Sequence, residues 1–386
     1  MSKTAIPAKV ANALWAKAAG RCQFRGCNEL LIGDLITGKK TGKYGYIAHI
    51  VADEAGGPRG DAVRSPQLAQ DIDNLMLMCP VHHKAIDVDH VADYDEAALL
   101  AMKAEHEDRI EIVTDMDVDR VSHVVRFAAD IGQRDAVITT RAIFAAMPPD
   151  HHPADFRTID IELIGSELKD HEEAYWAGQD RNLETAFARK IKERIEQREI
   201  RQLSVFALAP QPLLIRLGTL LGDVVPVSVH QKHREPDTWK WLPDQPRIAY
   251  KVNEYSGRED VPVALKLALS ATVNDERITS VLGEDTAIWS ITCEQPGNDI
   301  MRRKDDLAAY KKLVRNLFDR IKAYHGEGVM LHVFPALPAS AAVETGRVWM
   351  PKADLTMKIY DQNRTAQAFV PTIAIGLDTA ASLATS

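Results

Sequence analysis

The 386-residue sequence lacks three features, and each absence excludes a class of protein. No uncharged apolar stretch reaches the roughly 18 residues that a membrane span requires, so we expect no membrane partner. Four cysteines are too few for a disulfide-stabilised scaffold. Positive net charge is also absent, because 47 lysine and arginine residues face 55 aspartate and glutamate residues. Any contact with nucleic acid must therefore depend on local basic patches or on a bound cation.

The remaining composition is that of a folded protein with more than one domain. Apolar residues make up 46% of the chain and charged residues 26%, which excludes disordered and fibrous proteins. At roughly 150 residues per domain, the length predicts two or three domains. The first residues, MSKTAIPAKVANALW, show neither the apolar core nor the cleavage site of a signal peptide, so we expect a cytoplasmic protein.

Three of the four cysteines lie within the first 80 residues, which predicts a small, metal-organised module there. Its pattern predicts helices over residues 8–19, from near Pro80 to before Asp93, and over 95–112. The Gly/Pro-rich stretch 55–66 is typical of a loop.

Beyond this module, short apolar runs alternate with helical segments, which indicates an α/β domain with a largely parallel sheet. The predicted helices cover 182–200, 213–221 and 303–325. The predicted strands are 157–164, 203–209, 224–230, 261–271, 287–293, 328–334 and 355–360.

A repeated sequence pattern suggests how this second domain is built. The strand–loop–helix unit around 203–221 resembles the one around 329–345, so we expect two fused, related half-domains. The predicted organisation is a first domain over 1–115, a linker over 116–155 and a second domain over 156–386.

Two pairs of soft ligands stand at spacings that suit zinc. Cys22 and Cys27 are separated by four residues, and Cys79 and His82 by two. Such pairs can close a tetrahedral site, and four protein ligands leave no open position for catalysis. We therefore predict a structural zinc ion rather than ordinary buried cysteines.

Further polar residues near this knuckle are not explained by zinc. His49 follows the apolar run YGYIA, and Asn74 stands in DNLMLMC. His83 and Asp87 are four residues apart, so on a helix they face the same way. A neutral histidine can take a proton from water, and a divalent cation can neutralise a phosphate. Taken alone, a histidine such as His49 is more often a core residue, and Asn74 could be a simple turn or cap residue.

The arrangement C-x4-C … AHI … DNLMLMCPVHHKAID resembles the HNH endonuclease motif, the ββα-metal fold, over about residues 12–110. The resemblance implies an α+β fold for this first module. It also implies that His49, Asn74 and His83 are catalytic residues. In this assignment His49 is the general base, Asn74 holds the loop that carries His49, and His83 binds a catalytic Mg²⁺ or Mn²⁺.

Two positions depart from the pattern of many HNH enzymes. Ala48 stands where an Asp or His often adds a metal ligand, and Asp87 stands where a second helix histidine is common. We infer that His83 and Asp87 form the protein side of the cation site, because a set containing oxygen ligands suits Mg²⁺ or Mn²⁺. Asp89 and His90 are nearby alternatives for the second ligand, and we expect His106 to be a packing residue.

A double-stranded DNA substrate would need local attraction. Five basic residues flank the His49 loop and could contact phosphates, although solvated loop charge explains them equally well. They are Lys39, Lys40, Lys43, Arg59 and Arg64. We find no recognition helix, so we expect little sequence specificity.

The second domain lacks the GxxxxGK[ST] and GxGxxG motifs. In open α/β sheets ligands bind at the carboxyl ends of strands, where cations suit phosphates and tryptophans stack on bases. Alternatively, the tryptophans fill the core and the basic run is a surface turn. The candidate ligand-binding residues are Pro210, Gln211, Pro212, Gln231, Lys232, His233, Arg234, Trp239, Trp241, Phe334, Pro335, Ala336 and Pro338.

Four blocks in order, FALAPQPLL, QKHR…WKW, VALKLALSA and HVFPALPAS…GRVWMP, resemble the SAVED domain over about residues 155–375. The resemblance implies two fused CARF-like, Rossmann-like units that bind cyclic oligonucleotides.

An HNH module followed by a SAVED domain resembles the effector nucleases of the cyclic-oligonucleotide-based antiphage signalling system, CBASS. The resemblance implies a cyclic di- or trinucleotide activator, a ligand-induced homo-oligomer such as a tetramer, and degradation of double-stranded DNA. One alternative is a non-enzymatic sensor whose zinc module binds DNA or mediates oligomerisation. Another is a constitutive restriction nuclease with a reader of modified bases.

Overall fold

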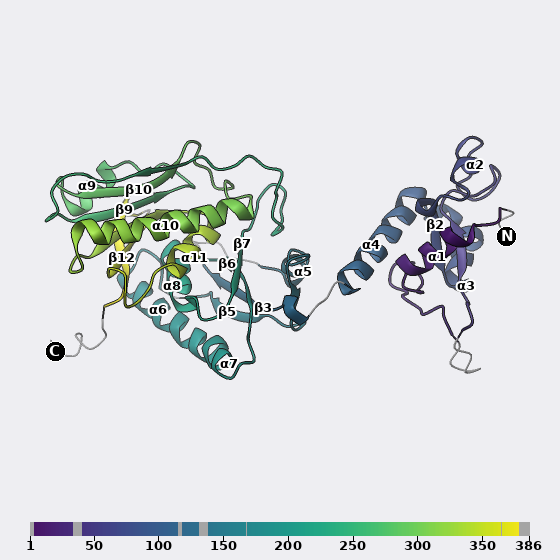
Figure 1. Ribbon diagram of the computed structural model, residues 1–386, viewed down its shortest axis with the longest axis horizontal. Coiled ribbons are helices and arrows are strands. Elements are labelled where there is room, and N and C mark those ends of the chain that lie inside the picture. The colour runs from purple at the N-terminus through teal and green to yellow at the C-terminus, as the bar shows by residue number, and fades with distance from the viewer. Residues whose placement is uncertain are drawn as a thin grey trace. The chain divides into compact units, whose positions relative to one another are not determined.

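The computed structural model describes residues 4–33, 41–114, 118–130, 138–166, 168–363 and 365–377 (Figure 1). The chain divides into two compact units, Met1–Asp117 and Val118–Ser386. The end of the first unit lies close to the predicted end of the first domain at residue 115. In the part of the chain that the structure describes, no helix is both long and apolar enough to cross a membrane.

The first unit is built around a small antiparallel sheet and the helix that follows it. Strand β1 (Tyr46–His49) pairs with β2 (Leu75–Met78), and His49 lies opposite Leu75. Pro80 begins the helix α3, because its missing N–H is not needed in a first turn. The helices of this unit are α1 (Ala8–Lys17), α2 (Arg64–Leu68), α3 (Pro80–Lys84), which continues into a π turn Ala85–Asp89, and α4 (Glu96–Thr114). Short 3-10 turns lie at Ile72–Asn74 and Val91–Asp93.

All four residues of β2 are buried, so this short strand is the centre of the first unit's core. Leu14 of α1 and Leu99 of α4 pack into the same cluster and are fully buried. Such burial is worth roughly 25 cal/mol per Å² of apolar surface. The cluster therefore fixes the ends of β1, β2 and α3, which carry the polar residues of interest.

The second unit begins with a parallel sheet in the order β4–β3–β6–β7, with β5 also paired to β3. Residues 116–155 were predicted to be a linker, and this prediction is wrong. They contain β3, which pairs along most of its length with β5 and β6. Most residues of β3 are buried. The sequence analysis missed this strand because a polar run precedes it. The strands are β3 (Val121–Ala129), β4 (His152–Pro153), β5 (Ile159–Leu163), β6 (Leu203–Leu208) and β7 (Val227–His230).

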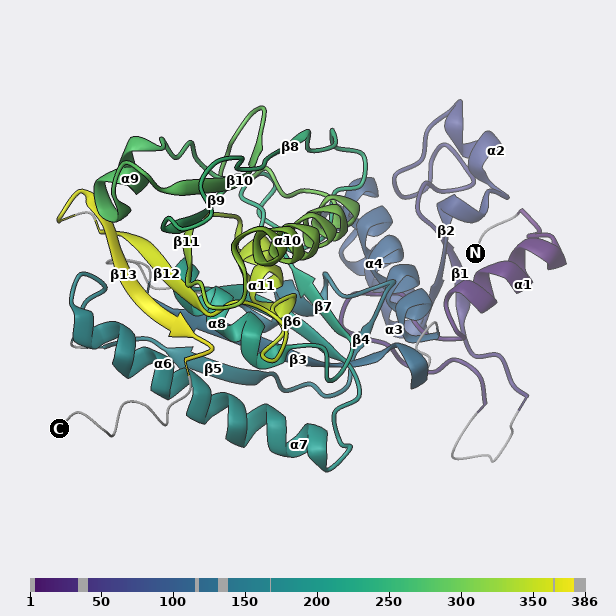
Figure 2. The same ribbon diagram turned by 60° about the vertical axis from the view of Figure 1, so that its left-hand side comes forward.

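A second sheet has the order β13–β12–β11–β9–β10–β8, with parallel inner strands and antiparallel edges. Figure 2 shows β13 at the outer edge beside β12. The strands are β8 (Tyr250–Asn253), β9 (Val263–Ala268), β10 (Ala287–Cys293), β11 (Leu331–Ala336), β12 (Met357–Asn363) and β13 (Ala368–Ile375).

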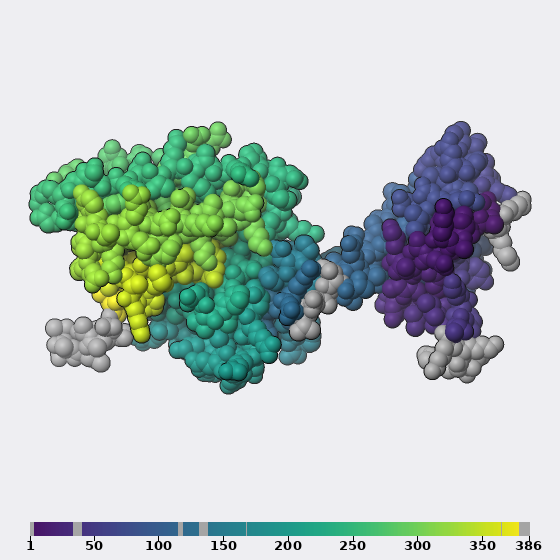
Figure 3. Space-filling model, viewed as in Figure 1, coloured from purple at the N-terminus to yellow at the C-terminus, as the bar shows by residue number. Residues whose placement is uncertain are grey.

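Helices cover these sheets, and α10 forms a lime-green ridge on the surface of the second unit (Figure 3). The helix predicted over 213–221 corresponds to α8, and the one predicted over 303–325 to α10. The helices are α5 (Thr140–Phe144), α6 (Glu173–Phe187), a π turn Ala188–Lys192, α7 (Glu193–Glu196), α8 (Gln211–Leu221), α9 (Glu276–Leu282), α10 (Lys304–His325) and α11 (Ala339–Arg347).

The two halves of this unit meet where α8 packs on α11. A Cβ atom at Gly218 would lie 2.1 Å from the carbonyl oxygen of Val343, and one at Gly346 would lie 1.9 Å from that of Ile215. The helices therefore touch backbone to backbone. The predicted repeat of 203–221 in 329–345 corresponds to two strand–helix units. They are β6 followed by α8, in the first half of the unit, and β11 followed by α11, in the second.

Candidate functional sites

Four soft ligand atoms of the first unit converge, as the spacing predicted. The sulfur atoms of Cys22, Cys27 and Cys79 and a ring nitrogen of His82 all lie within 4.8 Å of one another. The Cys79 Sγ atom is 3.1 Å from His82 Nδ1, and the Cys22 Sγ atom is 3.8 Å from the same nitrogen. Three sulfur donors and one nitrogen donor fit a structural zinc ion.

The knuckle is held in place by the chain around it. Gly26 adopts a φ of 85°, which lets the two cysteines on either side turn inward. The ring of Phe24 stacks on that of His82 at 4.1 Å, and Gln23 exchanges hydrogen bonds with Leu77 of β2. Burial raises the pKa of the Cys22 thiol to about 12 and also raises that of Cys79. A cation is therefore required to hold these groups as thiolates.

His49 ends β1 and is only 7% exposed. Its Nε2 atom lies 2.9 Å from the carbonyl oxygen of Ala69. Because a carbonyl can only accept, Nε2 carries the proton, and a neutral ring then keeps its lone pair on Nδ1. The hydrogen bond to Ala69 O therefore occupies one ring nitrogen of His49 and leaves Nδ1 as a possible proton acceptor.

Asn74 fixes the backbone that follows this histidine. Its Oδ1 atom accepts a hydrogen bond from the N–H of Val51 at 2.8 Å, and its Nδ2 atom donates to Val51 O at 2.8 Å and to Leu68 O at 3.2 Å. The N–H of Ile50 donates to the backbone oxygen of Asn74 at 2.9 Å. The side chain thus holds the loop that follows His49, which is the role that the HNH resemblance implied.

His83 and Asp87 face each other from α3 and the π turn. His83 Nε2 lies 3.5 Å from Asp87 Oδ2, and the His83 ring stacks on Tyr46 at 4.9 Å. The alternatives Asp89 and His90 instead pair with neighbouring charged residues, Lys84 and Asp93. One nitrogen and one carboxylate oxygen suit Mg²⁺ or Mn²⁺ if water and phosphate complete the shell.

The cysteine–histidine cluster is distinct from this pair in its number of ligands. Within the described residues, it is the single group of three or more potential ligands close enough to share an ion. His83 and Asp87 therefore supply at most two protein donors to a second cation. His106 Nε2 donates a 3.1 Å hydrogen bond to Ala18 O on the inner face of α4, as expected for a packing residue.

The predicted phosphate contacts are only partly available. Lys39 and Lys40 lie outside the described residues. Lys43 stands over the ring of Trp15 at 5.2 Å, and Arg64 pairs with Glu96. The prediction for Arg59 is wrong, because its side chain is 9% exposed and points into the unit.

In the second unit, the predicted strand–helix turns do come together. Gln211 Oε1 accepts a hydrogen bond of 2.9 Å from the N–H of Leu337, and so links the start of α8 to the end of β11. Gln231 Oε1 accepts from the N–H and the hydroxyl of Ser340 at 3.0 and 2.7 Å. These two amides join the halves of the unit and are not free for a ligand in this conformation.

Two aromatic residues predicted to contact a ligand instead fill the core. Trp239 is 2% exposed and meets Phe206 edge to face at 5.2 Å. Phe334 is fully buried and stacks on Tyr360 at 4.5 Å. A flat apolar ring suits a base and a protein core equally, and the sequence did not separate these uses. Also buried are Pro210, Pro212, Pro335, Pro338 and His233, whereas Ala336 is partly exposed.

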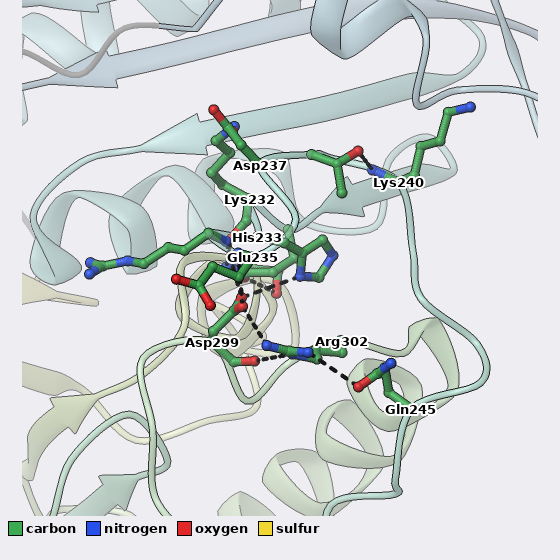
Figure 4. A network of polar contacts seen from close by, with 12 residues as sticks. Lys232, His233, Glu235, Asp237, Lys240, Gln245, Asp299 and Arg302 are labelled. Atoms are coloured by element: carbon green, nitrogen blue, oxygen red, sulfur yellow. Dashed lines mark hydrogen bonds and ion pairs between the residues drawn. The ribbon is translucent and has the colours of Figure 1, made fainter.

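Asp299 organises the basic segment that follows β7 (Figure 4). Its carboxylate lies 3.5 Å from His233 Nδ1 and 2.8 Å from Arg302 Nη2. It also accepts from the backbone N–H groups of Arg234 and Glu235 at 3.4 and 3.5 Å. The sequence analysis missed Asp299, although its position after the carboxyl end of β10 is where the strand-end rule would place a site.

Lys232 and Arg234, which we predicted to contact phosphates, differ in their availability. Lys232 pairs with Asp237 and stands over the Trp239 ring at 5.9 Å, and burial lowers its pKa. Arg234 is exposed. Trp241 is partly exposed and lines a cavity.

This cavity of about 150 Å³ lies between β7, α10 and α11. Cationic side chains of Lys304, Lys311 and Arg347 face it, beside the carboxylates of Asp150 and Glu344. Each cation pairs with one of these carboxylates. The sequence analysis missed them because they come from elements far apart in the chain. The other lining residues are His151, Val227, Ser228, Val229, His230, Trp241, Leu307 and Ala308.

Several buried polar atoms at this cavity lack a hydrogen-bond partner among the described residues. His230 is 4% exposed, and neither ring nitrogen has a hydrogen-bond partner among the described residues. His151 Nδ1 also lacks one there, and Glu344 Oε2 has only the ion pair with Lys311 at 3.5 Å. Burial lowers the pKa of His230 to about 3, so its ring is neutral at pH 7. A buried polar group without a partner costs roughly 1–3 kcal/mol, so a polar guest here would be stabilised.

Two joined α/β halves with a polar cavity can hold a polar ligand, but such an architecture does not by itself fix a function. The family model of the SMODS-associated and fused to various effectors sensor domain, SAVED, matches residues 183–375, half of the chain. The chain therefore belongs to the SAVED family, which confirms the resemblance found in the sequence. The HNH assignment of the first unit stays a prediction.

Solved structures of SAVED receptors are similar in part. The Acinetobacter baumannii Cap4 SAVED/CARF-domain containing receptor with the cyclic trinucleotide 2′3′3′-cAAA is 9% identical, with a TM-score of 0.42 over 72% of this chain and 56% of that one. The Moraxella osloensis Cap4 receptor is 9% identical, with a TM-score of 0.39 over 72% and 59%. The chain thus spans little more than half the length of these receptors. No curated protein matches the sequence.

Proposed function

We propose that this chain is a sensor of cyclic oligonucleotides joined to a metal-dependent DNA endonuclease, acting in antiphage defence of the CBASS type. Membership of the SAVED family carries the sensor half of the proposal. The Cap4 receptor structures, two of which hold cyclic trinucleotides, suggest the class of ligand. The hydrogen bonds around His49 support the nuclease half.

In the nuclease reaction, His49 is the general base. Its Nε2–H is held by Ala69 O, so Nδ1 accepts the proton of the attacking water. Asn74 fixes the loop of Ile50 and Val51, which keeps the ring in this orientation without a carboxylate partner. The chain thus prepares one nitrogen for proton transfer and uses the other for orientation.

His83 and Asp87 would hold a Mg²⁺ or Mn²⁺ ion. When bound, this cation would supply charge neutralisation at the phosphate and at the departing oxygen. The two side chains offer one nitrogen and one oxygen at 3.5 Å, a donor set that such ions accept. A zinc ion on Cys22, Cys27, Cys79 and His82 would keep α3, and with it His83, in place.

We place the phosphates of the cyclic oligonucleotide at the cavity beside Trp241. Lysine and arginine side chains line it, and the neutral His230 there lacks a partner. A volume of about 150 Å³ is below that of pockets that enclose a small ligand, roughly 300–1,000 Å³, so only part of the ligand would enter. Arg234 and Trp241 are then the accessible groups for its bases or remaining phosphate.

The ligand would control DNA cleavage if it binds an assembled state of the protein more tightly than the single chain. We expect a homo-oligomer, such as a tetramer, in which nuclease units act together on double-stranded DNA. Since the active state would cut the host genome, its resting population must be low.

The proposal is tested with the full chain, Mg²⁺, plasmid DNA and a panel of cyclic di- and trinucleotides. We expect cleavage only with one or a few of these ligands, together with an increase in mass on binding. Confirmed binding without cleavage by any ligand would contradict the nuclease half and favour a second candidate, a non-enzymatic sensor. That candidate draws support from Ala48, which removes a metal ligand common in HNH enzymes.

A further inference from the structure

Arg59 has an environment unusual for a loop arginine. Its guanidinium donates from Nε to Ile50 O at 2.6 Å, from Nη1 to Ile86 O at 2.9 Å and from Nη2 to Asp87 Oδ1 at 2.7 Å. A longer contact of 3.5 Å joins Nη1 to Tyr94 O. Because the side chain is only 9% exposed, these acceptors replace water around a full charge.

The loop AGGPRG is shaped to turn this side chain inward. Arg59 has a φ of 57°, a left-handed conformation that residues other than glycine rarely adopt. A Cβ atom at Gly60 would lie 2.5 Å from Glu54 O, and one at Gly57 would lie 2.6 Å from the Cβ of Ala52. Both glycines are therefore needed for the compact turn, and the hydrogen bonds of Arg59 offset its backbone strain.

The acceptors connect the two parts of the proposed nuclease site. Ile50 directly follows His49, the proposed base. Ile86 and Asp87 belong to the π turn that continues from the helix of His83. A single rigid, planar group thus joins the end of β1 to the element that would carry the cation.

Asp87 is the residue through which Arg59 reaches the proposed cation site. Its Oδ1 atom is taken by Arg59 at 2.7 Å, and its Oδ2 atom faces His83 Nε2 at 3.5 Å. Oδ2, on the side of His83, is therefore the oxygen better placed to bind a cation, and the contact with Arg59 sets this orientation. A lysine at position 59 could not reproduce three donors in a plane.

We propose that Arg59 is a positioning residue of the nuclease site. It orients Asp87 as a one-oxygen ligand beside His83 and holds His49 at a fixed place relative to that pair. This inference rests on the proposed nuclease function, and it replaces the phosphate contact that the sequence suggested for Arg59.

A purely structural role would stabilise the loop without affecting metal binding, so metal affinity separates the two roles. We would titrate the full-length, zinc-loaded chain with Mn²⁺ alone by calorimetry, for the wild type, Arg59→Lys and Arg59→Ala. The matched control is Arg25→Ala, which removes an exposed arginine paired with Glu105 in the same unit. Melting and zinc content would be measured for each variant, and Arg59→Lys serves if Arg59→Ala does not fold.

We expect Arg59→Lys to weaken Mn²⁺ binding by about tenfold or more, as loss of a partner behind a metal ligand commonly does. Its DNA cleavage should recover in part at high metal concentration, and Arg25→Ala should match the wild type. Wild-type Mn²⁺ affinity and metal dependence in a folded Arg59→Lys chain would overturn the inference, as would a wild-type chain that binds no Mn²⁺. If the metal result holds but no ligand triggers cleavage, the nuclease proposal fails and the positioning role stands.

Discussion

The Oδ1 atom of Asn74 accepts a 2.8 Å hydrogen bond from the N–H of Val51, two residues after His49. The amide returns a bond of equal length from Nδ2 to Val51 O. The Asn74 side chain thus bonds to the Val51 backbone in the way that a neighbouring strand would, just beyond the end of the β1–β2 sheet. The pairing fixes the backbone of the loop that follows His49.

Replacing Asn74 by alanine should leave the N–H and C=O of Val51 without partners. We expect activated DNA cleavage to fall by about 10- to 100-fold, because the ring of His49 loses a fixed orientation. Cyclic-nucleotide binding should be unchanged, since the ligand is assigned to the other unit. Single-turnover cleavage and calorimetry on the same protein check both parts. Wild-type cleavage in this variant would show that the amide has only a local structural role.

Removing the zinc site should unfold the first unit and spare the second. In Cys79→Ser a weak hydroxyl ligand replaces a thiolate, and zinc supplies much of the folding energy of so small a unit. Metal analysis should show loss of one zinc per chain, and the melting profile should lose one transition. A profile identical to that of the wild type would argue against the cysteine–histidine site.

Trp239 should behave as a core residue. Because it is 2% exposed against Phe206, Trp239→Ala should destabilise the second unit by about 3–5 kcal/mol. Chemical denaturation measures this cost. For a stacking residue on the surface we would instead expect a normal stability and a weakened ligand affinity.

The cavity makes a separate prediction about ligand affinity. Lys311→Ala removes a cation from its lining and should weaken cyclic-oligonucleotide binding by about tenfold, as loss of one phosphate contact would. Lys312→Ala is the control, because this neighbour is exposed and is not among the lining residues. Equal affinities in the two variants would move the ligand away from the cavity.

His230 should make the second unit sensitive to acid. Burial lowers its pKa to about 3, so between that value and its ordinary 6.5 the unfolded chain binds a proton that the folded chain refuses. Stability is therefore full above pH 6.5 and falls as the pH drops below it. This site alone should cost about 1.4 kcal/mol at pH 5.5. Unfolding of His230→Gln, compared with the wild type at pH 7.5 and 5.5, should show a smaller loss; an equal loss would assign the sensitivity to other groups.

Local spacing made the first unit predictable. The zinc ligands stand in two short segments, and each pair needs only one turn of chain to converge, so Cys22, Cys27, Cys79 and His82 were found from sequence. Arg59 was misassigned for the opposite reason. A charged residue in a glycine-rich loop usually faces water, and only the fold reveals that Ile50, Ile86 and Asp87 surround it.

Most strands of the second unit were predictable, although β3, β4, β8 and β13 were missed, and its site was less predictable. Parallel strands buried on both faces give continuous apolar runs, which the sequence displays. The cavity, by contrast, depends on side chains from β7, α10 and α11 that no local pattern relates. Trp239 and Phe334 were misassigned because the apolar rings that stack on bases also fill cores.

The most direct test of the account compares the wild type with His49→Ala in one plasmid-cleavage assay, with and without a cyclic oligonucleotide confirmed to bind both proteins. The account predicts rapid loss of intact plasmid for the wild type only when the ligand is present, and none above background for His49→Ala at equal ligand occupancy. Ligand-dependent cleavage by His49→Ala at the wild-type rate would contradict it.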